Sequence, residues 1–213
     1  MAYLRDTVFI LKNEPFREQD SWVTMYGREQ GKMVAVARGV RKWKAKQLGH
    51  LEPLAKVDVM IAKGASFDKI AVAQVIEPVP GQRDKLEAMA IQGAVSDLVD
   101  KLTHPMGEDE EVYFLLDELR AFFYLEGGLS AERGGLVLSV FTLKLLDHLG
   151  YAVHVESCVV CRRPITDRSW FAVEAGGLIC DECRRKHTEF YKSVPVSFLA
   201  VKLIKYLQHH PLA

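Results

Sequence analysis

All four cysteines of the 213-residue chain lie in two Cys-x-x-Cys pairs, Cys158 with Cys161 and Cys180 with Cys183. Eighteen residues separate the pairs, which is typical of structural zinc sites, where two short loops present four thiolates in a tetrahedron. Redox dithiol chemistry is the alternative, but it does not need two such pairs at this separation. We therefore predict that these four cysteines bind a zinc ion.

The predicted zinc is structural, because four thiolates leave no coordination position open for water or substrate. His154 and His187 are close enough in sequence to replace a cysteine, although a helix surface is the simpler position for His187. The flanking arginines have three interpretations: they contact phosphate, lower the pKa of the thiolates, or are solvated. These arginines are Arg162, Arg163, Arg184 and Arg185.

A second candidate site is a basic stretch without acidic residues between Glu29 and Glu52. Clustered cations neutralise phosphates and release counterions, and an aromatic ring among them can stack on a base. The stretch therefore indicates nucleic-acid binding, with a solvated loop as the alternative. The candidate contacts are Lys32, Arg38, Arg41, Lys42, Trp43, Lys44 and Lys46.

The acidic segment GEDEE (107–111) permits a divalent cation for nuclease chemistry, but acids are also favoured in the first turn of a helix. We interpret it as a helix start. The chain contains no G-x-S-x-G or H-E-x-x-H pattern. Positive signs of an enzyme are thus missing, and we expect neither a catalytic residue nor a small-molecule substrate.

Composition is that of an ordinary soluble protein, with 49% hydrophobic and 26% charged residues. The apolar run near the N-terminus is too short for a signal peptide, and no segment approaches the roughly 18 apolar residues of a membrane span. We expect a cytoplasmic protein without membrane contact. In the cytoplasm, four cysteines are more typical of a metal site than of disulfides.

Charge is unevenly distributed along the chain. Residues 1–79 carry 13 basic and 9 acidic residues, whereas residues 80–155 carry 6 basic and 13 acidic residues. Such asymmetry indicates parts with different partners.

The first eighty residues show the period-2 alternation of strands, with glycines between them. Strands are expected at about 3–12, 21–27, 33–37, 56–62 and 68–77, the last with Ile70, Val72 and Ile76 on one side. Five short strands in this length fit a small closed barrel. The OB-fold matches in size, and an SH3-like barrel is equally permitted.

The period becomes helical after EPVPGQR (77–83). Helices are expected around 91–102 and 112–123, then over about 134–149 with Gly150 as C-cap, and in the tail SFLAVKLIKYLQHH. Between the cysteine pairs, WFAVEAGGLIC predicts a hairpin with its turn at or near 175–177. Metal binding would stabilise this ribbon, because so short a segment cannot bury enough apolar surface by itself.

Three stretches together resemble the RecO family of bacterial DNA repair and recombination mediators, over nearly the whole chain. GREQGKMVAVARGVRKWKAK is similar to the strand and basic loop of that family. FTLKLLDHLGYAVHVESCVVC is similar to its helix leading into the first cysteine pair, and WFAVEAGGLICDEC to its ribbon and second pair. The last two are specific, since the residues around the cysteines agree as well as their spacing.

The resemblance implies an α+β protein: an N-terminal OB-fold (1–79), then a helical domain (80–213) with an inserted four-cysteine zinc ribbon at about 155–186. It also implies a nucleoid-associated protein that binds single- and double-stranded DNA and anneals complementary strands without nucleotide. RecR and single-stranded DNA-binding protein are the implied partners, so that RecA is loaded onto coated DNA. Because the chain ends earlier than the family pattern implies, we expect a shortened last helix. A zinc-ribbon adaptor without annealing activity is the alternative.

Overall fold

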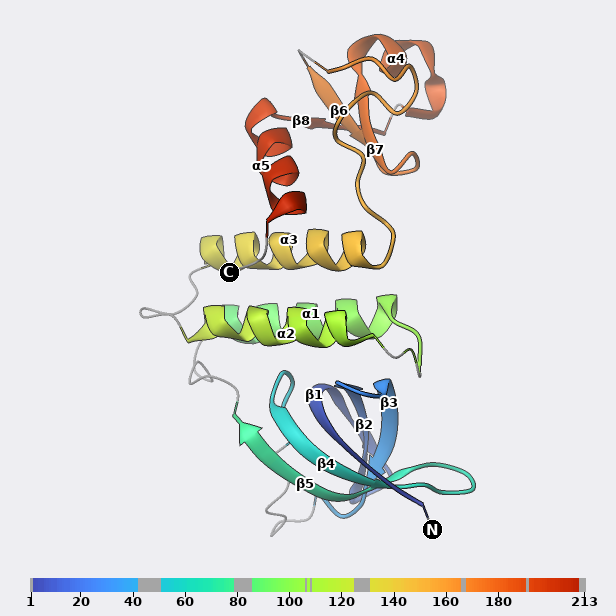
Figure 1. The fold of residues 1–213 in the computed structure, drawn as a ribbon, viewed down its shortest axis with the longest axis vertical. Coiled ribbons are helices and arrows are strands. Elements are labelled where there is room, and N and C mark those ends of the chain that lie inside the picture. The colour runs from blue at the N-terminus through green and yellow to red at the C-terminus, as the bar shows by residue number, and fades with distance from the viewer. Residues whose placement is uncertain are drawn as a thin grey trace. The chain divides into compact units, whose positions relative to one another are not determined.

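The computed structural model describes residues 2–41, 51–78, 86–105, 107, 109–124, 131–165, 168–190 and 192–210 (Figure 1). They divide into two compact units, Met1–Ser139 and Val140–Ala213. The first unit begins with five strands: β1 (Tyr3–Phe16), β2 (Asp20–Gly27), β3 (Gly31–Ala37), β4 (Lys56–Ala62) and β5 (Lys69–Glu77).

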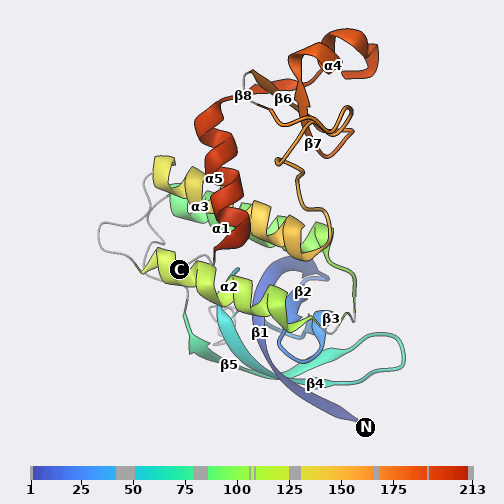
Figure 2. The same ribbon diagram turned by 45° about the horizontal axis from the view of Figure 1, so that its top comes forward.

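These strands close into a barrel in the order β1-β2-β3-β5-β4, with β4 pairing back onto the first half of β1. Neighbouring strands are antiparallel except β3 and β5, which meet in parallel at Val36 and Lys69. A closed five-stranded barrel of this kind is the OB-fold, so the predicted fold class is confirmed and the SH3-like alternative is not. Figure 2 shows the β4–β5 loop projecting beyond the barrel.

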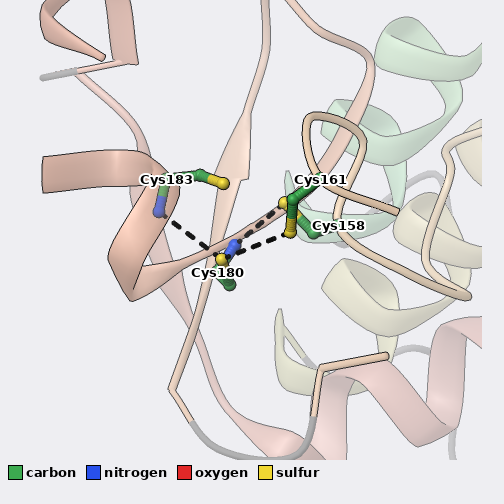
Figure 3. Close-up of side chains that lie close together, drawn as sticks. All are labelled: Cys158, Cys161, Cys180 and Cys183. Atoms are coloured by element: carbon green, nitrogen blue, oxygen red, sulfur yellow. Dashed lines mark hydrogen bonds between the residues drawn. The ribbon is translucent and has the colours of Figure 1, made fainter. Parts of the chain in front are cut away.

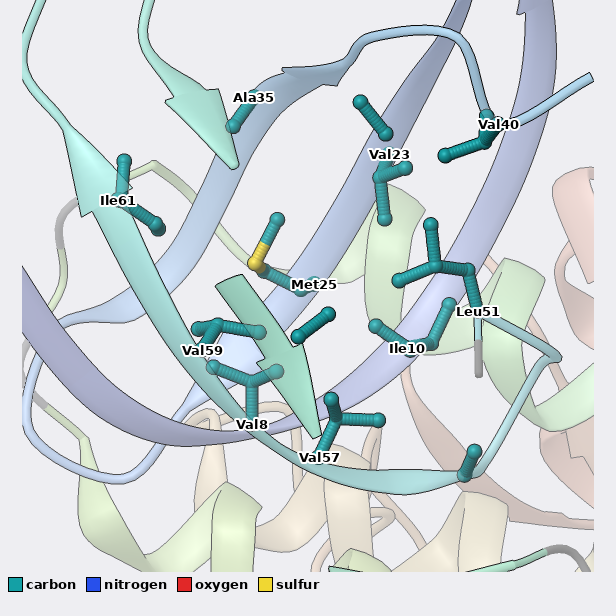
Figure 4. Close-up of a cluster of buried hydrophobic side chains, with 13 residues drawn as sticks. Val8, Ile10, Val23, Met25, Ala35, Val40, Leu51, Val57, Val59 and Ile61 are labelled. Atoms are coloured by element: carbon teal, nitrogen blue, oxygen red, sulfur yellow. The ribbon is translucent and has the colours of Figure 1, made fainter. Parts of the chain in front are cut away.

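The interior of the barrel is filled by small and β-branched side chains from all five strands (Figure 4). Successive residues of a strand point to opposite faces, so every second residue enters the core. In β4 the buried residues are Val57, Val59 and Ile61, as the alternation predicts. The inward-facing residues of the strands therefore form a hydrophobic core inside the barrel.

Strand β5 departs from the predicted alternation. Ile70 packs against the core, but Val72 and Ile76 lie on the exposed side, and Ala73 and Val75 face inward instead. The reason is a register shift: Ile61 pairs with Ile70, whereas the neighbouring Met60 pairs with Val72. One extra residue in β5 exchanges the two faces of the strand beyond it. The prediction that Ile70, Val72 and Ile76 share a side is therefore wrong.

The predicted helices are confirmed, with small shifts at their ends. They are α1 (Leu86–Leu102), α2 (Glu110–Phe123) and α3 (Ala131–His148), and α3 begins three residues earlier than the pattern indicates. Helix α3 ends at His148, and Gly150 follows it with a φ of +83°, which suits a residue without a Cβ atom. The backbone N–H of Tyr151 donates to the carbonyl of Leu146 (2.7 Å) and closes the last turn.

Lysines of the barrel bind aspartates of α1 and α2. Lys12 Nζ lies 2.7 Å from a carboxylate oxygen of Asp100, and Lys32 Nζ lies at the same distance from the other. Lys56 donates to Asp117 at 2.9 Å. Burial works to raise the pKa of Asp100, but the two lysines hold it below its ordinary value, so this carboxylate stays charged at neutral pH.

The second unit contains a three-stranded sheet of order β7-β6-β8, with β6 (Ser169–Ala172), β7 (Gly177–Cys180) and β8 (Val194–Val196). Strands β6 and β7 form the predicted hairpin, and Gly176 takes the positive φ (+63°) in its turn. The unit also contains helices α4 (Asp181–Lys186) and α5 (Phe198–His209), the short 3-10 helix Thr188–Phe190 and the part of α3 from Val140 on.

None of the helices within the described residues has the length and apolar character that crossing a bilayer requires. The division of the chain into domains at residue 79 stays a prediction.

Arg120 of α2 is buried, with 1% of its surface exposed. It links the end of β5 to α2. Its guanidinium donates to the carboxylate of Glu77 (3.0 Å), to the carbonyl of Pro78 (3.1 Å) and to the hydroxyl of Tyr124 (3.2 Å). The same cation lies over the ring of Phe9, 5.6 Å from its centroid. One side chain thus donates to three polar groups at the end of β5 and the end of α2.

We expect Arg120→Met to lower the free energy of unfolding by about 1–3 kcal/mol, since the hydrogen bonds of a buried guanidinium to Glu77, Pro78 and Tyr124 are lost. Urea denaturation measures this change. The control is Arg28→Met, because the pair of Arg28 with Glu110 is half-exposed on both sides and should contribute less than about 1 kcal/mol. Equal effects of the two substitutions would contradict the role assigned to Arg120.

Candidate metal centre and nucleic-acid interface

The four cysteine sulfurs converge on one point in the second unit (Figure 3). All four Sγ atoms lie within 4.8 Å of one another, and those of Cys161 and Cys180 are 3.9 Å apart. A zinc ion with bonds of roughly 2.3 Å to a tetrahedron of sulfurs places them about 3.8 Å apart. A disulfide needs roughly 2.05 Å, and none joins these cysteines. The arrangement therefore fits a tetrahedral metal.

The first cysteine pair lies on a tight loop. The backbone N–H of Arg162 donates to the carbonyl of Cys158 (2.9 Å), and the N–H of Cys158 donates to the carbonyl of Arg163 (3.0 Å). Arg162 itself adopts a positive φ of 60°, which reverses the chain directly after Cys161. This reversal points both sulfurs of the pair toward the same side.

The second pair lies where β7 passes into α4. Cys180 is the N-cap of α4, and its sulfur accepts the backbone N–H of Cys183 (3.5 Å). The N–H of Cys180 in turn donates to the sulfur of Cys158 (3.5 Å), which links the two pairs. Hydrogen bonds from backbone N–H groups favour the thiolate form that a metal requires.

The thiols of the cluster differ in acidity. The backbone N–H of Arg163, supported by its guanidinium, lowers the pKa of Cys161 to about 6, whereas burial raises the pKa of Cys183 to about 12. Four thiolates side by side, two of them buried, are unstable without a compensating charge. A divalent cation supplies that charge, so the donor set fits a metal ion in its chemistry as well as in its geometry.

The apolar core around the cluster is small. Its buried members are two of the cysteines together with Ala172 and Ile179. The segment before the first pair adds backbone contacts, with hydrogen bonds of 2.9 Å joining His154 to Gly176 and to Leu178. This buried set is small within the described part of the chain, and a metal ion held by the four cysteines would add to its stability.

The nearby histidines and arginines have other partners. His154 Nε2 lies 3.0 Å from Ser157 Oγ, and His187 lies beside Glu189 (3.2 Å). Neither belongs to the cysteine cluster found among the described residues. Arg163 pairs with Glu182 at 2.7 Å and lowers the pKa of Cys161, which supports the second of the three interpretations for this arginine.

The residues of the predicted basic stretch lie in two different environments. Lys32, at the start of β3, is only 11% exposed in its side chain and bonds to Asp100. Arg38 and Arg41 follow the other end of β3 and are exposed. Lys32 and Arg38 are separated by the length of the strand, which is roughly 20 Å. The candidates Lys42, Trp43, Lys44 and Lys46 lie outside the described residues.

The turn that carries Arg38 and Arg41 is tied to the β1–β2 turn. The backbone N–H of Gly39 donates to the carboxylate of Asp20 (2.9 Å), and the N–H of Arg41 donates to the carbonyl of Gln19 (3.1 Å). Both arginines therefore belong to the end of the barrel formed by the β1–β2 and β3–β4 connections.

An aromatic cluster at the same end was not predicted from the sequence. The rings of Phe16, Trp22 and Phe67 contact one another, although the three residues come from distant parts of the chain. Local patterns give no sign of such a cluster. An OB-fold assignment gives one indirect sign, since it places the turns after β1 and β4 beside the ligand face.

The acidic segment 107–111 does begin a helix. Asp109 is the N-cap of α2, and its carboxylate accepts the backbone N–H of Glu111 at 3.1 Å. The prediction of a helix start is confirmed for these residues, while Glu108 lies outside the described residues.

Comparison with known proteins places the chain in a family. A family model described as "Recombination protein O N terminal" matches residues 1–79, and one described as "Recombination protein O C terminal" matches residues 83–213. The chain belongs to the RecO family. Its resemblance to that family in the cysteine and basic segments is thereby confirmed.

Curated relatives agree. "DNA repair protein RecO" of Pelotomaculum thermopropionicum is 31% identical over the whole chain and 80% of its own length. Proteins of the same name from Alkaliphilus metalliredigens (27%) and Heliobacterium modesticaldum (28%) match over 93% and 89% of the chain, and over 78% and 68% of their own lengths. The chain is thus a DNA repair protein of the RecO family whose cysteine cluster is compatible with zinc.

Metal removal is expected to act on the second unit first. Cys158→Ser should abolish stoichiometric metal binding and lower the melting temperature of that unit, because three ligands hold the ion poorly. Inductively coupled plasma mass spectrometry gives the metal content, and circular dichroism gives the melting curve. His154→Ala is the matched control and should keep one metal ion per chain. Loss of metal in the control, or its retention in Cys158→Ser, would contradict the ligand set.

Proposed function

We propose that the chain is a non-enzymatic DNA repair and recombination mediator that binds single- and double-stranded DNA through its barrel and anneals complementary strands. RecR and single-stranded DNA-binding protein are its proposed partners in loading RecA onto coated DNA. Membership of the RecO family supports this role. The observation that carries the DNA contact is the way in which the basic residues of the barrel divide into two groups.

In the first group, every cation is held by an acid. Lys12, Lys32 and Lys56 bind aspartates of α1 and α2, and the others bind acids of the barrel or of α2. These cations are unavailable to phosphate without breaking a pair. The group comprises Arg5, Lys12, Arg28, Lys32, Lys56 and Lys63.

In the second group, no ion pair to an acid occurs within the described part of the chain. It comprises Arg17, Arg38, Arg41 and Lys69, all from the β1–β2, β3–β4 and β4–β5 connections or the residues beside them. Their charges can meet a phosphate backbone at the cost of desolvation alone. Lys42, Lys44 and Lys46 follow directly in the sequence and extend the same basic stretch. Lys32 is left out of this proposed contact set because its charge is already paired.

Annealing needs no covalent step. Two DNA strands repel each other through their phosphates, and a cationic surface that holds both lowers this repulsion until complementary bases meet. The proposed role of zinc is separate: bound to Cys158, Cys161, Cys180 and Cys183, it supplies structural ligation and no reaction chemistry.

We expect Arg38→Gln combined with Arg41→Gln to weaken binding of both DNA forms roughly 10- to 30-fold and to flatten the slope of log affinity against log salt by about 2, one for each lost phosphate contact. Fluorescence anisotropy over a salt series measures both quantities. The control removes the same charge at paired sites, with Arg5→Gln and Lys101→Gln. An equal effect of both double variants would show that net charge alone, not the location of these arginines, matters.

An annealing assay separates the mediator from a zinc-ribbon adaptor that only binds proteins. Labelled complementary oligonucleotides should pair faster with the protein than without it, in the absence of nucleotide, and also when single-stranded DNA-binding protein coats them. The reason is the neutralised repulsion between strands. No acceleration with bare strands would favour the adaptor, and acceleration only with bare strands would remove the proposed partner.

A further inference from the structure

Three aromatic rings form a cluster outside the barrel core. The ring centroids of Phe16 and Trp22 are 4.8 Å apart, those of Trp22 and Phe67 5.8 Å, and those of Phe16 and Phe67 6.3 Å. All three side chains are half-buried, and none belongs to the residues that fill the barrel. The cluster is therefore partly open to solvent and is not an extension of the core.

The register of the strands places this cluster on the outer face. Val23 and Met25 of β2 point into the barrel, so Trp22 between Ser21 and Val23 points away from it. Trp22 lies opposite Val36 of β3, and the N–H of Val36 donates to the carbonyl of Asp68 in the β4–β5 loop (2.8 Å). The rings thus lie where the β2–β3 face meets the β1–β2 and β4–β5 loops, which is where OB-folds hold oligonucleotides.

Two cations lie over the rings. The guanidinium of Arg17 is 5.0 Å from the centroid of Phe16, and the ammonium of Lys69 is 5.8 Å from that of Phe67. Neither makes an ion pair to an acid within the described ranges. Two acids close to them in the sequence have other partners, since Asp68 pairs with Lys63 at 2.8 Å and Asp20 accepts the N–H of Gly39. Glu18, in the same turn as Arg17, is exposed.

We propose that Phe16, Trp22 and Phe67 form a stacking site for the bases of single-stranded DNA, with Arg17 and Lys69 placed to bind the flanking phosphates. The combination decides the class of ligand: flat apolar rings match a base, and the cations above them match the phosphates on either side of it. This inference rests on the proposed DNA binding, and it adds a preference for single-stranded over double-stranded DNA at this site.

The site discriminates between the two forms of DNA. In a duplex each base is stacked on its neighbours and its faces are closed, so the rings cannot reach it. In a single strand a base can leave its neighbours and stack on an aromatic side chain, which strengthens binding. Arg38 and Arg41 can serve both forms through the backbone, while the three rings serve only the single strand.

The experiment compares Phe67→Leu with the matched control Phe114→Leu. Phe114 of α2 is also an exposed ring with an arginine near it, since Arg28 lies 5.4 Å from its centroid, but that arginine is paired with Glu110. Anisotropy titrations with a labelled oligothymidylate and with a duplex of equal length are the readout. Phe67→Leu should weaken single-strand binding about 5- to 150-fold and leave duplex binding unchanged, and the control should change neither.

A second measurement does not depend on the stability of Phe67→Leu. The chain has three tryptophans, so Trp43→Phe with Trp170→Phe leaves Trp22 as the sole source of tryptophan fluorescence. Oligothymidylate should quench it, because a stacked base lies against the indole, and the duplex should not.

The outcomes are distinct. Equal loss of single-strand and duplex affinity in Phe67→Leu, or absence of quenching despite binding, would overturn the stacking site and leave the proposed DNA binding intact. Failure of the unaltered protein to bind either DNA would overturn the proposed function itself.

Discussion

The ion pairs between the barrel and helices α1 and α2 determine which basic residues of the barrel remain without an acidic partner among the described residues. Lys12, Lys32 and Lys56 hold Asp100 and Asp117 at hydrogen-bonding distance. Each pair contributes modestly to stability, because the carboxylates are partly solvated. Their number and position nevertheless fix α1 and α2 against the barrel in one arrangement. Some of the excess acidic residues of segment 80–155 therefore pair with lysines of the barrel. Those residues are not available for binding other molecules.

After this pairing, the two ends of the barrel differ in the charge that they leave unpaired. Charges on the helix side are satisfied within the chain, and the cations without an acid, among the described residues, gather around the loops at the other end of β3. Lys32 and Arg38 illustrate the contrast, since they are close in sequence and opposite in role. Electrostatic attraction toward phosphate is strongest where no internal anion competes for the cation. The helices therefore leave the loop end of the barrel, among the described residues, as the place where cations are not already paired with an acid.

Local patterns predicted the elements that depend on nearby residues. The cysteine pairs, the helix start in segment 107–111 and the hairpin turn near 175–177 all follow from spacing of a few residues, and all are found in the structure. The faces of β5 were predicted wrongly, because one extra residue reverses an alternation that sequence alone presents as regular. The burial of Lys32 and the aromatic cluster were not predictable in this way. Both arise from contacts between residues far apart in the chain, which only the closed barrel brings together.

The barrel and the segment around the cysteines draw on apolar burial to different extents, and this separates their dependence on the environment. Among the described residues, the barrel core contains thirteen buried side chains, whereas the core around the cysteines contains four, two of them cysteines themselves. A unit held by ligation gains stability only as the free metal concentration exceeds its dissociation constant. A unit held by apolar burial has no such dependence. The core of the barrel, as described, contains none of the four cysteines, so loss of a metal ion would act first on the segment around them.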